Sequence, residues 1–338
     1  MVREIRSLQV TGGNTFIVSL PKSWINAFNL KAHDKVAVIE REDNSLAIYP
    51  LKILDKKSKK SITFTYSELG NENTLIRECI GSYLSGYTII KIIFDKGSIT
   101  KKNQIKNILR NKLIGIEVIE EGIDNMTIQV FAETKEAGLM KTLNRIFSVV
   151  YLMLENAIEG IKNNKEILEE VANLDDEVDR FYHFITRQIN LALEDPYSMI
   201  DLGVSKKALL IEYRLFAKTL ERIADHVCTI SKNYLESKLE PNKELMRDVY
   251  QVADLIKKLF WKASNSFINS NAKLARETAL EIEKFIFQIE ILLDKMMKKR
   301  LDSDIKILFR VMIESFKRIS EYSMDICEMT INTEKISK

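Results

Sequence analysis

From about residue 137 to the end of the chain, apolar residues recur at spacings of three and four, the pattern of helices that pack against other helices. The chain has 338 residues but only 4 prolines and 11 glycines, so few positions interrupt this pattern. The pattern predicts helices near Gly138–Asn163, Ile167–Leu193, Ser205–Leu235, Lys243–Ile268, Ala272–Lys299 and Asp304–Asn332.

Two of these predicted helices carry paired acids beside an apolar stripe. Asp175 and Asp179 each follow a stripe position by one residue, and Glu221 and Asp225 do the same in the next long helix. Residues four apart lie on one face of a helix, one turn from each other, so each pair presents two carboxylates side by side. The pattern leaves two interpretations. The four acids form a cation site, or they are a solvated helix margin on which Glu221 pairs locally with Lys218.

The helical part also repeats itself after about a hundred residues. Sliding its first half onto its second pairs Arg222 with Arg318 and Ile230 with Ile326. A tandem repeat of three helices explains this match, because most matching positions belong to the apolar stripes. We therefore predict two three-helix bundles, over residues 137–236 and 240–335.

Residues 1–50 read as short strands and turns rather than as long helices. Thr15–Leu20 is strand-like, Lys22–Asn29 is a short helix after a proline, and Lys35–Ile39 and Leu46–Tyr49 are two further strands. A unit this small buries little apolar surface by itself. We therefore expect an intertwined homodimer formed through residues 1–50.

The stretch TGGNTFIVSLPKSWINAFNLKAHDKVAVIEREDNSLAIYP resembles the SpoVT/AbrB family of β-rich swapped-hairpin domains. The resemblance rests on a strand, the pattern LPK-x-W, a short helix, a D-x-V-x-V strand and a final hairpin. It implies a homodimer that binds DNA through basic residues near the N-terminal strand and its loops, here Arg3, Arg6 and Lys22. Two alternatives stay open: these charges are ordinary solvated ones, or the domain serves mainly to dimerise.

Between the β-rich and helical parts lie a basic connector and a mixed segment. Residues 51–60, LKILDKKSKK, are typical of a linker. Residues 61–136 alternate strands and helices in the order βαβαββ, which predicts a small α/β domain. Neither turn into its helices has the spacing of a dinucleotide or nucleoside-phosphate loop. We therefore expect this domain to be a spacer or a partner surface.

The two acid-bearing helices carry a second resemblance. Asn173–Arg180, NLDDEVDR, and Leu220–Ile230, LERIADHVCTI, look like the signature helices of the PhoU family of phosphate-uptake regulators. The likeness covers roughly residues 138–335 and implies two three-helix bundles. An N-terminal SpoVT/AbrB domain before such a region is similar to an archaeal type of phosphate regulator.

PhoU-like proteins are associated with iron or zinc clusters held by E(D)xxxD motifs. Residue by residue, the resemblance assigns the metal ligands to Asp175, Asp179, Glu221 and Asp225. The second half departs from the motif, because Lys317 stands at the counterpart of Glu221 and Phe285 at the counterpart of Asp179. Neither side chain ligates a metal, so the second half is not expected to hold a cluster of its own.

The sequence contains no pattern that favours an enzyme. A ferritin-like di-iron site needs Glu-x-x-His, which neither bundle histidine completes, and no nucleophile triad or phosphate loop stands out. The three cysteines are far apart, which is typical of a reduced, cytoplasmic protein. Apolar runs fall far short of the roughly 20 residues that span a bilayer, so no membrane insertion is expected. The net charge of +3 does not by itself indicate a nucleic-acid or membrane partner.

These features together predict a multidomain, non-enzymatic regulator of phosphate homeostasis. Its parts are a dimerising, DNA-binding domain at residues 1–50, a linker at 51–60, an α/β domain at 61–136 and the two bundles. The main alternative is an adaptor that docks on a phosphate ABC transporter or a sensor kinase without touching DNA. A carboxylate-metal enzyme is a third alternative, against which the degraded second half argues.

Overall fold

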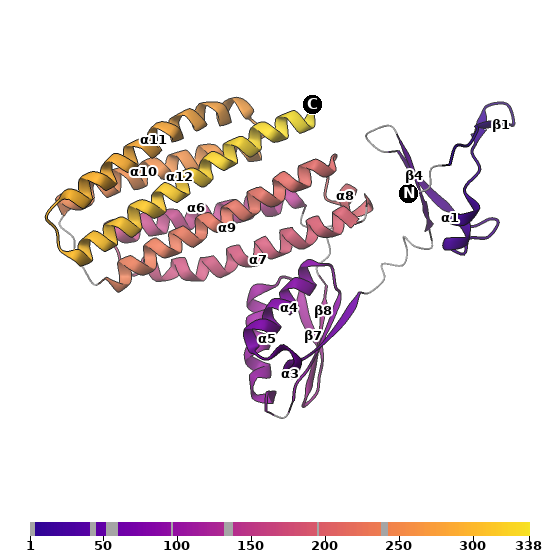
Figure 1. Ribbon diagram of the computed structural model, residues 1–338, viewed down its shortest axis with the longest axis horizontal. Coiled ribbons are helices and arrows are strands. Elements are labelled where there is room, and N and C mark those ends of the chain that lie inside the picture. The colour runs from indigo at the N-terminus through magenta and orange to yellow at the C-terminus, as the bar shows by residue number, and fades with distance from the viewer. Residues whose placement is uncertain are drawn as a thin grey trace. The chain divides into compact units, whose positions relative to one another are not determined.

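The computed structural model describes residues 4–40, 45–51, 60–95, 97–131, 138–194, 196–237 and 243–338. The chain divides into two compact units, Met1–Lys59 and Lys60–Lys338 (Figure 1). The predicted fold class is confirmed: a β-rich N-terminal part, a small α/β domain and an all-helical C-terminal part. Most of the predicted basic linker lies outside the described residues.

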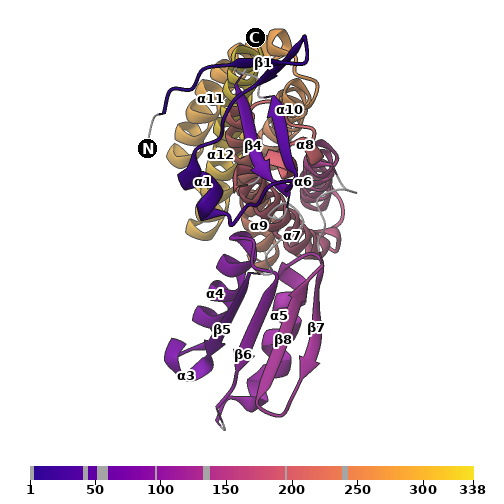
Figure 2. The ribbon, with the colours of Figure 1, turned by 90° about the vertical axis from the view of Figure 1, so that its right-hand side faces the viewer.

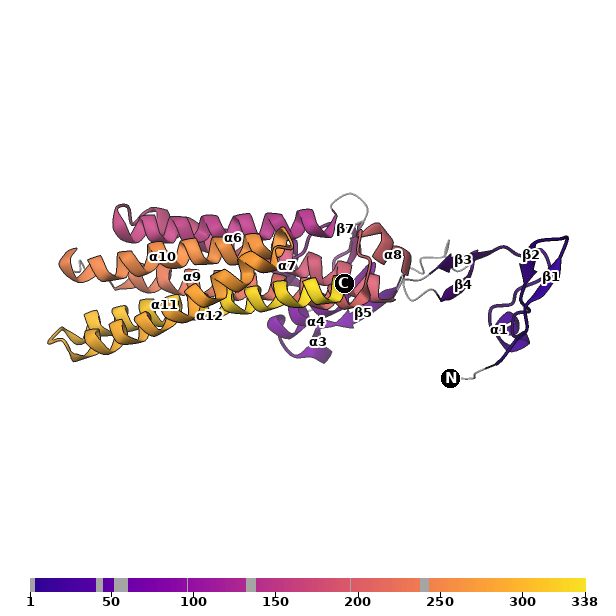
Figure 3. The same cartoon turned by 90° about the horizontal axis from the view of Figure 1, so that it is seen from above.

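The N-terminal unit consists of two antiparallel hairpins and one short helix. β1 (Gln9–Thr11) pairs with β2 (Thr15–Ile17) across a turn in which Gly12 and Gly13 both have positive φ, which glycine adopts without strain. After α1 (Lys22–Ala27), β3 (Val36–Glu40) pairs with β4 (Leu46–Pro50). The hairpins form separate two-stranded sheets (Figure 3), and β2 is shorter than the predicted strand Thr15–Leu20.

Within one copy of the chain, this unit has almost no core. Of the described residues up to Leu51, only Ala47 and Pro50 are buried. Large apolar side chains are exposed on both hairpins and around α1, including Ile5, Leu8, Val10, Phe16, Phe28, Val38 and Leu46. Isolated two-stranded hairpins are marginally stable at best, so this surface needs a further partner surface.

The α/β domain is a four-stranded sheet with two helices packed on one face (Figure 2). Its strand order is β5-β6-β8-β7, with β5 and β6 parallel and the other pairs antiparallel. The elements follow the predicted βαβαββ order, with two short additional helices. They are β5 (Ser61–Thr65), α3 (Tyr66–Leu69), α4 (Glu72–Leu84), β6 (Ile89–Ile93), η1 (Ile99–Lys101), α5 (Lys102–Lys112), β7 (Ile116–Glu121) and β8 (Asn125–Val130).

Local chemistry explains where α4 begins and how it packs. The side chain of Asn71 accepts a hydrogen bond from the backbone N–H of Thr74 at 2.9 Å and so caps the N-terminus of the helix. Leu75 and Tyr83 on α4 lie at helical spacing and are fully buried against the sheet. The Tyr83 hydroxyl donates to the backbone oxygen of Ile114 at 3.0 Å and so ties α4 to the loop between α5 and β7.

Six long helices build the described part of the C-terminal region, close to the predicted bounds. They are α6 (Leu139–Lys162), α7 (Ile167–Glu194), α9 (Lys207–Glu236), α10 (Lys243–Ile268), α11 (Ala272–Lys298) and α12 (Ser303–Ser337). Where the sequence predicts only a break, the structure has a short helix, α8 (Pro196–Asp201). It begins at Pro196, and the fixed φ of proline suits the first turn of a helix.

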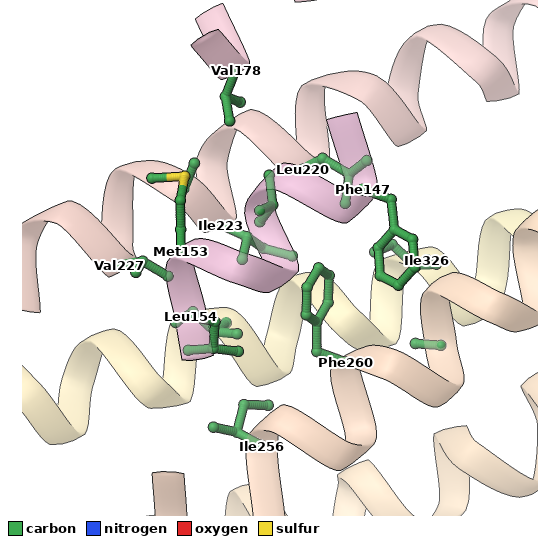
Figure 4. Close-up of a cluster of buried hydrophobic side chains, with 14 of the residues drawn as sticks. Phe147, Met153, Leu154, Val178, Leu220, Ile223, Val227, Ile256, Phe260 and Ile326 are labelled. Carbon is green, nitrogen blue, oxygen red and sulfur yellow. The ribbon is translucent and has the colours of Figure 1, made fainter. Parts of the chain in front are cut away.

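The six helices share one continuous apolar core. The predicted stripe on α9 is confirmed, because Leu220, Ile223, Val227 and Ile230 are all fully buried. Figure 4 shows side chains from both halves of the repeat meeting there, namely Phe147, Met153, Leu154, Val178, Leu220, Ile223, Val227, Ile256, Phe260 and Ile326. None of the helices among the described residues combines the length and the apolar character needed to cross a bilayer.

Candidate functional site

The four predicted acids come together on the facing margins of α7 and α9. Each follows a stripe residue by one position, which places it at the edge of the buried seam rather than inside it. Asp175, Asp179 and Glu221 are half-buried, whereas Asp225 is more exposed. Because α7 and α9 pack against each other, the structure places the two pairs of acids on neighbouring helix margins.

The electrostatics of the acids show that they lie close to one another. Burial, together with the charges of Asp179 and Asp225, raises the pKa of Asp175 to about 6. Burial also raises the pKa values of Glu221 and Asp225, and each receives a further contribution from Asp179. Neighbouring carboxylates that share a partly buried site disfavour each other's ionised form. The site therefore favours a positive charge or a bound proton.

Lysines of the same chain supply positive charge at two of the acids. Lys218 Nζ lies 2.5 and 2.6 Å from the two carboxylate oxygens of Glu221, the local pairing that the sequence left open as an alternative. Lys112, the last residue of α5, lies with its Nζ 3.3 Å from Oδ2 of Asp179. The α/β domain thus reaches the acid site directly.

The carboxylate oxygens of these acids are chemically suited to a hard cation, but they are not arranged as a metal site in this structure. Carboxylate oxygens are the ligands that hard cations prefer. Across the described part of the chain, however, no three His, Cys, Asp or Glu residues form a group that could hold a metal ion. The neighbouring Cys228 does not improve the set, because burial raises the pKa of its thiol to about 12 and the thiolate is the form that binds metal.

Further polar residues of α7, which the sequence did not single out, join it to the α/β domain. Arg187 is buried and donates to the backbone oxygens of Tyr83 and Tyr87, the latter at 3.0 Å. Asn190 donates to the backbone oxygen of Leu84 at 2.9 Å. These carbonyls lie at and just beyond the C-terminal end of α4, where a helix attracts positive charge.

One more contact involves the end of α5. Nδ1 of His183 lies 3.0 Å from the backbone oxygen of Lys112, the residue whose side chain reaches Asp179. The one sequence signal for this interface was the run of polar residues that interrupts the stripe of α7 at Arg187 and Gln188. That signal gives no indication of which partner those residues contact.

Comparison with known protein families matches residues 143–234 to the PhoU domain, a range that begins in α6 and ends in α9. The first half of the helical part is thus similar to the PhoU domain. All four acids lie inside the matched range. Residues 9–56 match a second family, antidote-toxin recognition MazE, bacterial antitoxin. The two recognised resemblances are thus confirmed at the level of domains.

Among solved structures, a similar chain is the phosphate transport system regulatory protein PhoU from Streptococcus pneumoniae. It is 19% identical, with a TM-score of 0.47, over 58% of this chain and 93% of that chain. A search of curated protein sequences gave no match.

The second half of the repeat differs from the first half at the acid positions. Lys317 replaces the counterpart of Glu221, and its Nζ lies 2.6 Å from Glu290. Phe285, at the counterpart of Asp179, is buried in the core. Glu281, the counterpart of Asp175, pairs with Lys262 at 2.8 Å. Here surface ion pairs and core packing stand in place of an acid cluster.

The predicted DNA contacts lie in the unit that matches the MazE family. Lys22 is exposed at the start of α1, and the exposed side chain of Arg6 pairs with Glu4. Arg3 lies outside the described residues. The structure therefore leaves Lys22 and Arg6 on the surface, where a phosphate group could reach them.

Proposed function

We propose that this chain is a non-enzymatic regulator of phosphate uptake and phosphate homeostasis that acts through binding. The observation that carries the proposal is the PhoU domain match, which includes all four acids of the site. In this function the helical region docks on a protein partner, a phosphate transporter or a sensor kinase. The N-terminal unit joins two copies and binds an operator.

Two observations on the N-terminal unit support dimerisation and DNA binding. Residues 9–56 match the MazE family, and the unit lacks a core of its own in a single copy. A second copy would cover the exposed apolar residues of both hairpins and would bring two sets of basic side chains together. Clustered cations are what DNA phosphates require.

DNA binding is tested with a fragment of the promoter region of the chain's own operon. We expect the variant Arg6→Ala/Lys22→Ala to bind at least about tenfold more weakly, because a protein with fewer cations at the phosphates releases fewer counterions from the DNA. The slope of log K against log salt should become shallower by about 0.9 for every phosphate that the variant no longer neutralises. Electrophoretic mobility shift at several salt concentrations measures both quantities.

A matched control removes the same amount of positive charge from the helical region instead. The variant Lys262→Ala/Lys273→Ala removes two lysines from α10 and α11, and it should bind DNA as the unmodified protein does. If the unmodified protein shows no salt-dependent binding, or the two double variants behave alike, the DNA-binding role is wrong. The adaptor that docks on a transporter or kinase then becomes the better proposal.

We also propose that Asp175, Asp179, Glu221 and Asp225 bind iron or zinc when Lys112 and Lys218 turn away from them. A metal bound there would add positive charge that lowers the pKa values of the acids. Elemental analysis of protein purified without chelators should find metal in the unmodified chain and less in Asp179→Ala/Asp225→Ala. Asp176→Ala, an exposed acid on the same helix, is the control and should keep its metal. Equal metal content in all three proteins would refute this assignment.

A further inference from the structure

Two cavities open where the α/β domain meets α7, and Arg180 lines both. The first has a volume of about 580 Å³ and lies between the α5–β7 loop and α7. The second, of about 550 Å³, lies further along α7 beside Asp176 and Glu177. Arg180 is the residue directly after Asp179, so it belongs to the signature segment without being one of the predicted ligands.

The guanidinium of Arg180 lacks an acidic partner among the described residues, and its Nε is buried without a hydrogen bond. The other arginines nearby are paired. Arg110 lies 3.0 Å from Glu117, and Arg145 lies 2.8 Å from Glu177. A buried N–H group without a hydrogen-bond partner costs free energy, which an incoming anion would recover.

The balance of charge separates the two cavities. Arg110 and Arg180 face one acid, Glu117, in the first cavity. The Arg110–Glu117 pair is exposed at both ends, and such pairs contribute little, so an anion can replace Glu117 at Arg110. In the second cavity Arg180 faces two acids instead. The first cavity is therefore the one suited to an anion.

The rest of the first cavity is apolar. Leu113 and Ile116 are buried in the α/β core, whereas Phe131, directly after β8, is 53% exposed at the rim. A concave apolar surface with a few convergent polar groups is typical of small-molecule sites, and a guanidinium fork matches the oxygens of a phosphate or carboxylate. We propose that this cavity binds a small aromatic metabolite with an oxyanion group, the oxyanion on Arg180 and the ring on Phe131.

Isothermal titration calorimetry of the full chain at low salt tests this site with three probes. Adenosine 5′-monophosphate carries a phosphate, 2-naphthoate carries a carboxylate, and adenosine is neutral. We expect at least one of the two anions to bind, and adenosine to bind at least about tenfold more weakly than its monophosphate if the phosphate is the group recognised. Arg180→Gln should lower the affinity for the anion by about tenfold or more, and Phe131→Ala should also lower it.

Arg145→Gln is the matched control, because Arg145 lies on α6 and lines neither cavity. Arg145→Gln should change the affinity for the bound anion by less than about twofold. Arg180→Lys keeps the charge but not the forked guanidinium, so its affinity should lie between those of the unmodified protein and of Arg180→Gln. The proposal is overturned if neither anion binds the unmodified protein, or if Arg180→Gln and Arg180→Lys, both folded by thermal unfolding, bind as the unmodified protein does. It does not depend on DNA binding or on metal, so its failure leaves the proposed function standing.

Discussion

Replacing both Val10 and Phe16 by aspartate is expected to convert the protein from a dimer into a monomer. The two residues are directly opposite each other on β1 and β2, and they are 58% and 67% exposed in one copy of the chain. In the proposed dimer they are covered by the second copy, and a buried, unpaired carboxylate costs several kcal/mol. Light scattering after size-exclusion chromatography should then report about 39.1 kDa in place of twice that mass.

The control for this experiment places the same charge on another exposed apolar residue. Phe287 on α11 is 65% exposed, and Phe287→Asp should leave the dimer intact. Because residues 1–59 and 60–338 are separate compact units, the far-ultraviolet helical signal of Val10→Asp/Phe16→Asp should stay unchanged. A double variant that remains dimeric, or an unmodified protein that is monomeric, contradicts dimerisation through the N-terminal unit.

Replacing Asp175 by asparagine is expected to stabilise the metal-free protein at pH 7.5. The pKa of Asp175 rises from 3.8 to about 6 in the folded state, so folding favours the protonated form of this acid. The stability that the proton provides is complete below about pH 4 and is lost as the pH rises through 6. At pH 7.5 the ionised carboxylate therefore costs about 1–3 kcal/mol, which the neutral asparagine avoids.

Urea unfolding at pH 7.5 and at pH 4, with chelator present, measures this effect. Asp175→Asn should be more stable than the unmodified protein at pH 7.5, and the difference should shrink toward zero at pH 4. Asp176→Asn is the control, because this exposed acid is the next residue on the same helix. A variant less stable than the unmodified protein at pH 7.5 would show that the Asp175 carboxylate has a favourable partner in the folded protein.

The positions of the helices, and the location of the acids at the edge of the buried stripe, were predictable from the sequence because the burial of apolar residues decides both. Leu220 and Ile223 repeat at helical spacing, and a residue one position further lies at the margin of the buried stripe whatever the helix packs on. Spacing within one helix therefore sufficed to place Glu221. It also sufficed for Lys218, which pairs with Glu221 across a single turn.

Contacts between distant segments were not predictable in the same way. Lys112 and Asp179 are 67 positions apart, and nothing in either segment marks the other as its partner. Arg187 shows a related limit, because its partners are backbone oxygens, which every residue carries. The sequence could indicate that a polar residue interrupts the stripe of α7, but the carbonyls at the C-terminal end of α4 become its partners only in the folded chain.

The attachment of the α/β domain to α7 has a mechanical consequence. His183, Arg187 and Asn190 hold α4 and α5 by their carboxyl ends, where backbone oxygens are fixed in position by the helices themselves. The sheet extends away from this attachment, so a small rotation of α7 about its own axis displaces the far edge of the sheet by a larger distance. If the helix that carries Asp175 and Asp179 rotated, the far edge of the α/β domain would therefore move further than the acids themselves.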